Sequence, residues 1–161
     1  MEHDLIESEE IILLKKKGFS LYELGDYVGA INAYSGVLKI DSENIGAFKN
    51  IGFILMKNRQ FQEAINIYNK LINLNPEDAE NINSKGVALY QSGHYQEALY
   101  TYNDALKLDP GNIIILNNKG GTLIHLGNYI EALEVSIEVL RIDRNNEIAL
   151  RNSYIAFPHV S

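Results

Sequence analysis

Cysteine and tryptophan are absent from this sequence of 161 residues, and it contains only three prolines. Without cysteine the chain can form neither a disulfide framework nor a thiolate metal site, which fits a reducing compartment. No apolar run approaches the roughly 20 residues that a membrane-spanning helix needs. Residues 1–10 also lack the basic head and apolar core of a secretory signal. These absences predict a soluble, cytoplasmic protein with no membrane contact.

Basic charge is scarce as well, because the formal net charge is −7. Residues 1–10 carry five acidic side chains and no lysine or arginine, so they account for −5 of this charge and residues 11–161 for only −2. Binding to duplex nucleic acid requires a broad basic surface. We therefore expect no nucleic-acid partner.

A unit of 34 residues repeats four times without an insertion, in residues 11–44, 45–78, 79–112 and 113–146. Position 8 of each copy is glycine, position 20 is alanine and position 17 is aromatic. A glycine inside a helical pattern costs roughly 1 kcal/mol relative to alanine, so its return in every copy requires a cause. The predicted cause is close packing of one helix on its neighbour, which a Cβ atom would prevent. The glycines are Gly18, Gly52, Gly86 and Gly120.

Each copy contains two helical patterns joined by a short polar turn, as at Gly93-His94, which predicts two antiparallel helices per copy and no β-strands. Copies end in pairs such as Asp109-Pro110, in which the acidic residue can cap the next helix and proline suits its first turn. Residues 147–161 begin a fifth copy and are expected to form a capping helix and a tail. Residues 1–10 are either an acidic extension or the start of the first helix, since Asp4 and Glu7 have capping-box spacing.

Over residues 11 to about 157 the pattern resembles the tetratricopeptide repeat, whose period is 34 residues. The shared features are glycine at position 8, leucine at 11, an aromatic residue at 17, alanine at 20, tyrosine at 24 and proline at 32. Two copies depart from the pattern: the fourth has Ser136 at position 24 and Arg144 in place of proline, and the first has Ser42 in place of proline. The resemblance implies an all-α fold, a right-handed α-α superhelix (solenoid) of antiparallel helix pairs. It also implies a non-catalytic scaffold for protein-protein interaction.

Motifs for catalysis or cofactors are absent. The sequence has no phosphate-binding GxxxxGK[ST] loop, no HExxH zinc motif and no GxSxG nucleophile elbow. His125 and His159 share position 13 of successive copies, but two histidines without a third ligand favour a solvated surface over a metal site. We predict no enzyme activity, no cofactor and no metal.

The resemblance places positions 2, 5, 6, 9, 12 and 13 of the first helices on a concave groove. Asn50, Asn118 and Asn152 share position 6, and a row of amides can hydrogen-bond the backbone of an extended peptide. Such a ladder resembles the one in the repeat domain of O-linked N-acetylglucosamine transferase; the alternative is that asparagine is simply common in this sequence. The candidate peptide-binding residues are Lys15, Lys16, Phe19, Tyr22, Lys49, Asn50, Phe53, Asn83, Ser84, Tyr90, Asn117, Asn118, Arg151 and Asn152.

The charge of the groove positions favours an acidic peptide, because they carry a net +3 on an acidic chain. The alternative is a chance bias on a solvated helix face. The family's carboxylate clamp for chaperone C-termini is not predicted: Lys15 and Asn50 match its pattern, but Phe19, Glu80 and Ser84 do not.

A second hypothesis is self-assembly. Residues 147–157 carry more apolar side chains than a lone capping helix can bury on one face, and exposed apolar patches often mark contact surfaces. The rival prediction is therefore a structural protein that forms a homo-oligomer through residues 147–157.

Overall fold

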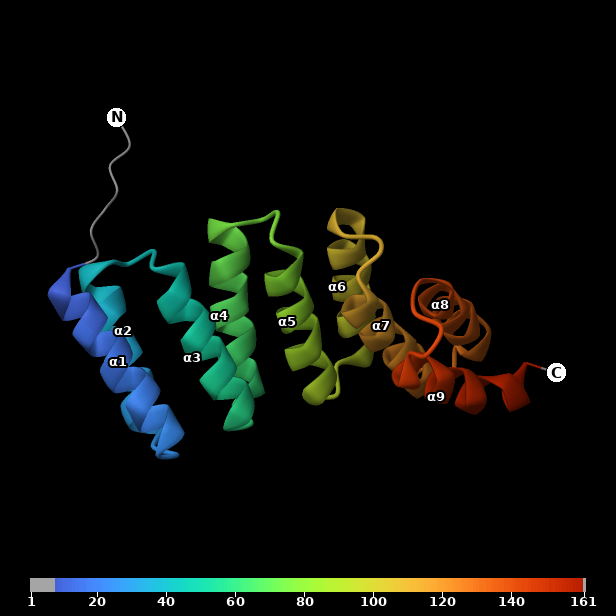
Figure 1. Ribbon diagram of the computed structural model, residues 1–161, viewed down its shortest axis with the longest axis horizontal. Coiled ribbons are helices and arrows are strands. Elements are labelled where there is room, and N and C mark those ends of the chain that lie inside the picture. The colour runs from blue at the N-terminus through green and yellow to red at the C-terminus, as the bar shows by residue number, and fades with distance from the viewer. Residues whose placement is uncertain (1–7, 161) are drawn as a thin grey trace. The chain divides into compact units, whose positions relative to one another are not determined.

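The computed structural model describes residues 8–160, and over that range the chain is helical, with no strand (Figure 1). The all-α fold class is therefore confirmed. The helices are α1 (Glu9–Glu23), α2 (Tyr27–Ile40), α3 (Ile45–Lys57), α4 (Phe61–Leu74), α5 (Ala79–Gln91), α6 (Tyr95–Leu108), α7 (Ile113–His125), α8 (Tyr129–Ile142), α9 (Glu147–Ala156) and the 3-10 helix η1 (Phe157–His159).

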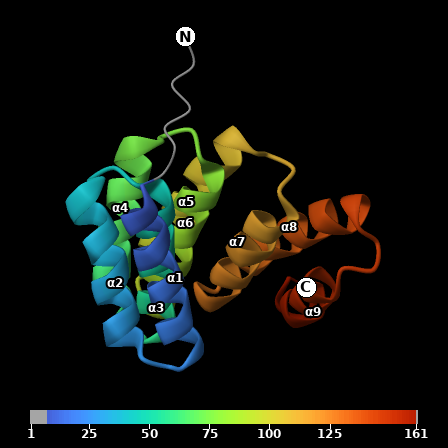
Figure 2. The ribbon, with the colours of Figure 1, turned by 60° about the vertical axis from the view of Figure 1, so that its left-hand side comes forward.

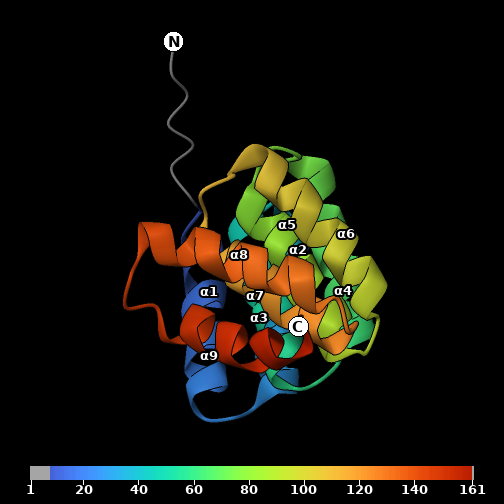
Figure 3. The same ribbon diagram turned by 90° about the vertical axis from the view of Figure 1, so that its right-hand side faces the viewer.

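The chain divides into two compact units between Leu74 and Asn75. In the first unit α1 packs on α2, α2 on α3 and α3 on α4; α1 and α3 lie on one side, with α2 and α4 on the other (Figure 2). In the second unit α5 packs on α6, α6 on α7 and α7 on α8. Helix α9 then lies against both α7 and α8 (Figure 3).

Polar side chains begin the first helix of each pair, but they lie three residues later than the expected caps. Asn112, not Asp109, is the N-cap of α7, and its Oδ1 accepts the backbone N–H groups of Ile114 and Ile115 at 3.1 and 3.2 Å. Asp109 instead closes α6 and accepts a hydrogen bond from Nδ2 of Asn112 at 2.9 Å. The proline suggested for the first helical turn therefore lies in the connecting turn.

The same correction holds at the other pairs: Asn44 and Asn146 cap α3 and α9, and each donates its side-chain amide to the aspartate three residues before it. At the N-terminus Ser8 is the N-cap of α1 and accepts from the Ile11 N–H at 3.3 Å. The cap proposed at Asp4 lies outside the described residues. These caps set where each first helix begins, and so which side chains share its faces.

Glycine at position 8 makes room for a tyrosine ring from the second helix of the same pair. A Cβ added to Gly86 would lie 2.5 Å from Cε1 of Tyr102, which is closer than carbon atoms can approach. In the same way, a Cβ added to Gly18 would lie 2.7 Å from the Tyr34 ring, and one added to Gly52 would lie 2.9 Å from the Tyr68 ring. The recurring glycine is thus explained by close packing, as expected.

The fourth glycine has a different neighbour. Ser136 occupies the position of the tyrosine, and its hydroxyl donates to the Ala132 carbonyl of its own helix at 2.8 Å. A Cβ on Gly120 would instead meet Nδ2 of Asn152 at 3.2 Å and Cγ1 of Val135 at 3.7 Å. The missing ring therefore leaves space at Gly120, and the Asn152 side chain from α9 fills it.

Candidate functional site

Aromatic and basic side chains from α1 and α3 meet on one surface of the first unit. The rings of Tyr22 and Phe53 lie 5.6 Å apart, centroid to centroid, at an interplanar angle of 58°. Phe53 and Phe19 remain exposed, and Phe19 lies one helical turn before Tyr22. Nζ of Lys57 lies 5.3 Å from the centre of the Phe53 ring. We call the surface made by Lys15, Lys16, Phe19, Tyr22, Lys49, Asn50, Phe53 and Lys57 the α1–α3 face.

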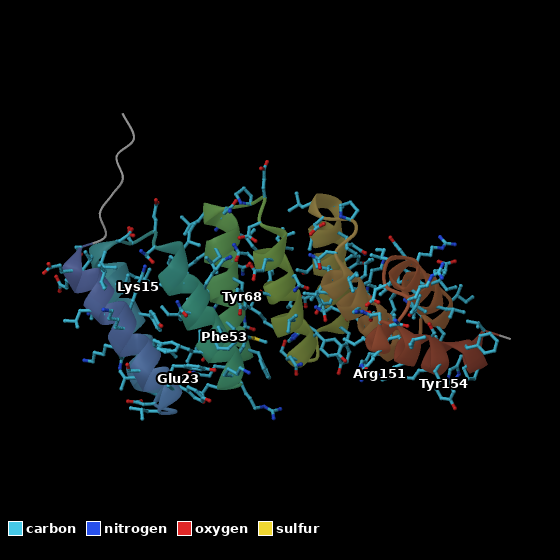
Figure 4. The ribbon with its side chains drawn as sticks, viewed as in Figure 1. Lys15, Glu23, Phe53, Tyr68, Arg151 and Tyr154 are labelled. Carbon is cyan, nitrogen blue, oxygen red and sulfur yellow. The ribbon has the colours of Figure 1, made fainter. Side chains whose placement is uncertain are left out.

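Of the α1–α3 face, Lys15 comes from α1 and Phe53 from α3 (Figure 4). Lys16 is exposed, whereas Lys15 and Lys49 are half-buried. Nζ of Lys15 lies near the first turn of α3. It is 3.8 Å from the point that a Cβ atom would occupy on Gly46, the second residue of that helix. The face therefore combines exposed aromatic surface with several ammonium groups, and Glu23 is the one acidic residue among the groove positions of these two helices.

Asn50 is the candidate ladder residue of the α1–α3 face and is exposed. Its Nδ2 donates to the Gly46 carbonyl of its own helix at 2.8 Å. Within residues 8–160 its Oδ1 accepts no hydrogen bond, so this oxygen can take an N–H group from a bound backbone.

The asparagines of the second unit are not equivalent to Asn50. Asn118 is half-buried and donates its Nδ2 to Oδ1 of Asn83 at 3.0 Å, which ties α7 to α5. Asn117 and Asn152 are 8% and 3% exposed. Nδ2 of Asn117 donates to Oδ1 of Asn146, the N-cap of α9, at 3.0 Å. The sequence-based placement of Asn117 and Asn152 on an open groove surface is therefore corrected: both side chains pack among α7 and α9.

A cavity of about 190 Å³ lies among α5, α7 and α9 and gathers the remaining candidates of the second unit. Tyr90 lines it, together with Arg151, Asn117, Asn118 and Asn152. Arg151 is exposed on α9 (Figure 4). Burial, and then the neighbouring Tyr95, raises the pKa of Tyr90, while the Arg151 guanidinium opposes that rise. The Tyr90 hydroxyl thus stays protonated beside the arginine.

Ser84 is half-buried on α5 and is not among the residues that line the cavity. The sequence-predicted set is therefore brought together as two separate groups, one within each unit. In the first unit the group is aromatic and basic, and in the second it is an amide-rich cavity with one arginine.

Two histidine-tyrosine stacks were not anticipated from the sequence. The His125 ring stacks on Tyr95 at 4.9 Å with an interplanar angle of 14°, and His159 stacks on Tyr129 at 4.1 Å and 17°. In both pairs the two residues are 30 positions apart in the sequence. The tyrosine is at position 17 of one copy and the histidine at position 13 of the following copy. This shared spacing is the sequence signal from which the stacks could have been predicted. In the described part of the chain no three residues of the histidine, cysteine or acidic types are grouped to hold a metal ion.

Comparison with protein families gives two matches. The family described as anaphase-promoting complex, cyclosome, subunit 3 matches residues 57–139, and a tetratricopeptide repeat family matches residues 21–84. No curated protein matches the sequence. None of the helices within residues 8–160 is both long and apolar enough to cross a membrane.

Solved structures with the same arrangement of helices include a crystal structure of MamA protein, with a TM-score of 0.84 at 23% identity over 94% of this chain and 82% of that chain. A tetratricopeptide repeat protein from Parabacteroides merdae matches with a TM-score of 0.87 at 20% identity, over 94% of this chain and 60% of that chain. The TPR domain of Arabidopsis OM64 matches with a TM-score of 0.69 at 23% identity, over 73% of this chain and 98% of that chain. These likenesses establish the solenoid fold, and with the family matches they show that the chain belongs to the tetratricopeptide repeat family.

Proposed function

We propose that this chain is a non-catalytic protein-interaction scaffold whose α1–α3 face binds an extended, acidic peptide. The tetratricopeptide fold supports a role in protein binding in general. The observation that carries the specific proposal is the contact of Tyr22 with Phe53, with Lys57 over the Phe53 ring. Apolar side chains of a peptide would cover these exposed rings while its carboxylates approach the ammonium groups.

The two kinds of contact contribute differently to affinity. An exposed ion pair contributes only about 0.2–1 kcal/mol, because water and salt screen it. Aromatic surface that becomes covered contributes roughly 25 cal/mol per Å², and aromatic residues are frequent among the side chains that dominate binding. The rings should therefore supply most of the affinity, and the lysines should select acidic over basic peptides and speed association.

Charge reversal on the α1–α3 face should weaken this binding. We expect the double variant Lys16→Glu, Lys49→Glu to reduce affinity about tenfold, equivalent to about 1.4 kcal/mol, because two attractive contacts become repulsive. The measurement is fluorescence anisotropy with a labelled peptide of about 12 residues, long enough to span about 40 Å when extended, in which glutamates alternate with leucines. Raising the ionic strength should weaken binding of the same peptide.

Two controls make this experiment specific. Lys39→Glu changes an exposed lysine in the last turn of α2, outside the α1–α3 face, and should leave affinity unchanged. A peptide with lysine in place of every glutamate should bind the native chain more weakly than the acidic peptide does. Equal binding of the two peptides would overturn the proposed selectivity, and loss of binding in Lys39→Glu would show that net charge, not this face, is responsible.

A second candidate function is self-assembly through α9 and η1. Tyr154 and Phe157 are 83% and 69% exposed, and Ile148, Leu150 and Ile155 are exposed as well. The opposite side of α9 is committed to the core of the second unit, where Ala149 and Ala156 are buried. A second copy that covered Leu150, Tyr154 and Phe157 would remove these apolar side chains from water.

Charged substitutions on α9 test this assembly without removing the helix. If the native chain is an oligomer, Tyr154→Glu combined with Phe157→Glu should convert it to a monomer by light scattering, because two carboxylates would then lie in an apolar contact. The matched control is Tyr100→Glu, an exposed tyrosine of α6 in the same unit, which should leave the molar mass unchanged. A native chain that is monomeric at about 100 μM would exclude assembly in that range.

A further inference from the structure

The turn between α3 and α4 holds an arginine where the other helix pairs hold a glycine. The backbone φ of Arg59 is 60°, in the left-handed region. This conformation belongs to the way α3 ends, because the Gln60 N–H donates to the Leu55 carbonyl at 2.9 Å, as in a Schellman motif. A residue with a Cβ atom loses stability in this conformation, whereas glycine does not. The other three copies have glycine at this position, with φ of 79° at Gly25, 85° at Gly93 and 76° at Gly127.

The contact made by the Arg59 side chain does not account for the arginine. Its guanidinium lies over the Phe61 ring, 6.0 Å from the centroid. The Arg59 side chain is exposed, and an exposed cation–π contact gains no more free energy than the strained backbone costs. Glycine would therefore be at least as stable at this position. Strained residues that a structure retains are concentrated at functional sites, which points to a role for Arg59 in binding.

Arg59 lies at the end of the α1–α3 face. Lys57, which belongs to that face, is the last residue of α3. The Arg59 N–H donates to the Met56 carbonyl at 3.1 Å, which fixes the turn against the end of the helix. Met56 has the same repeat position as Tyr22, another residue of the face. A peptide that lies along the face toward the end of α3 would therefore reach the arginine.

We propose that Arg59 is a specificity-determining residue that binds a carboxylate of the acidic peptide; the inference rests on the function proposed for the α1–α3 face. Within residues 8–160 the guanidinium pairs with no carboxylate. Its N–H groups lie in one plane and can hold a carboxylate by two parallel hydrogen bonds. Lys57 offers a charge without this planar geometry. Arg59 thus gives the face a means to distinguish a carboxylate from a neutral amide of the same shape.

The first test measures this discrimination. Two labelled peptides of about 12 residues are compared by fluorescence anisotropy, one with glutamates that alternate with leucines and one with glutamine in place of every glutamate. The ratio of their affinities should fall about threefold in Arg59→Gln, as expected for an exposed ion pair, while affinity for the glutamine peptide stays the same. Arg141→Gln removes an exposed arginine of α8 and should leave the ratio unchanged.

The second test separates binding from packing. Arg59→Gly should raise the melting temperature by about 2 °C, because the backbone strain is relieved, and should weaken binding of the glutamate peptide about threefold. Gly93→Arg introduces the same strain into the third copy, at a position where a Cβ atom would meet nothing within 4 Å, and should lower the melting temperature. An arginine kept for packing alone would give a lower melting temperature in Arg59→Gly, which would overturn the proposal.

Failure of this inference and failure of the proposed function give different results. If the native chain prefers the glutamate peptide and Lys16→Glu with Lys49→Glu weakens its binding, an unchanged ratio in Arg59→Gln would exclude Arg59 alone. If the native chain does not prefer the glutamate peptide, the acidic ligand of the α1–α3 face and the role of Arg59 are both excluded.

Discussion

Tyr102→Ala is expected to lower the free energy of unfolding of the second unit by about 3–5 kcal/mol, the range measured for removal of a large ring from a protein core. Tyr102 is 1% exposed, and its ring lies against Gly86, where no side chain can move in to replace it. The loss is a large share of the about 5–15 kcal/mol by which a domain is stable. Urea unfolding followed by circular dichroism at 222 nm measures it.

Tyr100→Ala is the matched control for this substitution. Tyr100 lies two residues earlier on α6 and is 63% exposed, so its removal should change stability by no more than about 0.5 kcal/mol. The same contact can be tested by substituting the glycine. Gly86→Ala should destabilise the chain more than Gly120→Ala, because Gly86 faces the Tyr102 ring and Gly120 faces no tyrosine ring. Equal effects of Tyr102→Ala and Tyr100→Ala would contradict the packing described here.

The contrast between Gly86 and Gly120 shows how much of the fold could be predicted from the sequence. A glycine that returned every 34 residues predicted close packing, and the tyrosine at position 24 accounts for it in three of the helix pairs. The sequence showed that Ser136 replaces the tyrosine at that position. It did not show that Asn152 fills the space left by the missing ring, because a repeat pattern gives the features that the copies share and not the neighbours of one particular copy.

The candidate site was predicted less completely for the same reason. Asn50 and Asn152 share position 6, but Asn50 is exposed while Asn152 fills the space beside Gly120. Equal repeat positions place two side chains at the same offset on their helices. Burial then depends on the neighbouring helix, which the offset does not specify.

The basic and aromatic residues of α1 and α3 were easier to identify, because neighbouring first helices of one pattern bring positions 9 and 12 together. The ring contact between Tyr22 and Phe53 follows from that register. The division between Leu74 and Asn75 has no counterpart in the sequence, since the 34-residue period runs through it without an insertion.

Alkaline conditions should destabilise the chain strongly between about pH 10 and 12. Burial raises the pKa of Tyr68 from its ordinary value of 10.0 to about 12. Burial, and to a lesser degree the nearby Tyr90, also raises the pKa of Tyr102. Above pH 10 these phenols ionise in the unfolded chain while they stay protonated in the folded one, so the unfolded state binds fewer protons and stability falls as pH rises.

The expected loss for Tyr68 follows from the size of its shift. A shift of about two pKa units at about 1.4 kcal/mol per unit corresponds to about 3 kcal/mol, fully present as stability below pH 10 and lost as the pH approaches 12. Urea unfolding of the native chain and of Tyr68→Phe at pH 8, 10 and 11 measures the difference, and other groups that titrate in this range cancel in the comparison.

Tyr68→Phe should retain more of its stability at pH 11 than the native chain does, because phenylalanine has no phenol to ionise when the chain unfolds. Tyr154→Phe, a change at an exposed tyrosine, should lose stability as the native chain does, since Tyr68 is still present. Parallel loss in the native chain and in Tyr68→Phe would mean that the phenol of Tyr68 is reached by water in the folded state. The ring would then not be enclosed between α3 and α4 as its contact with Gly52 requires.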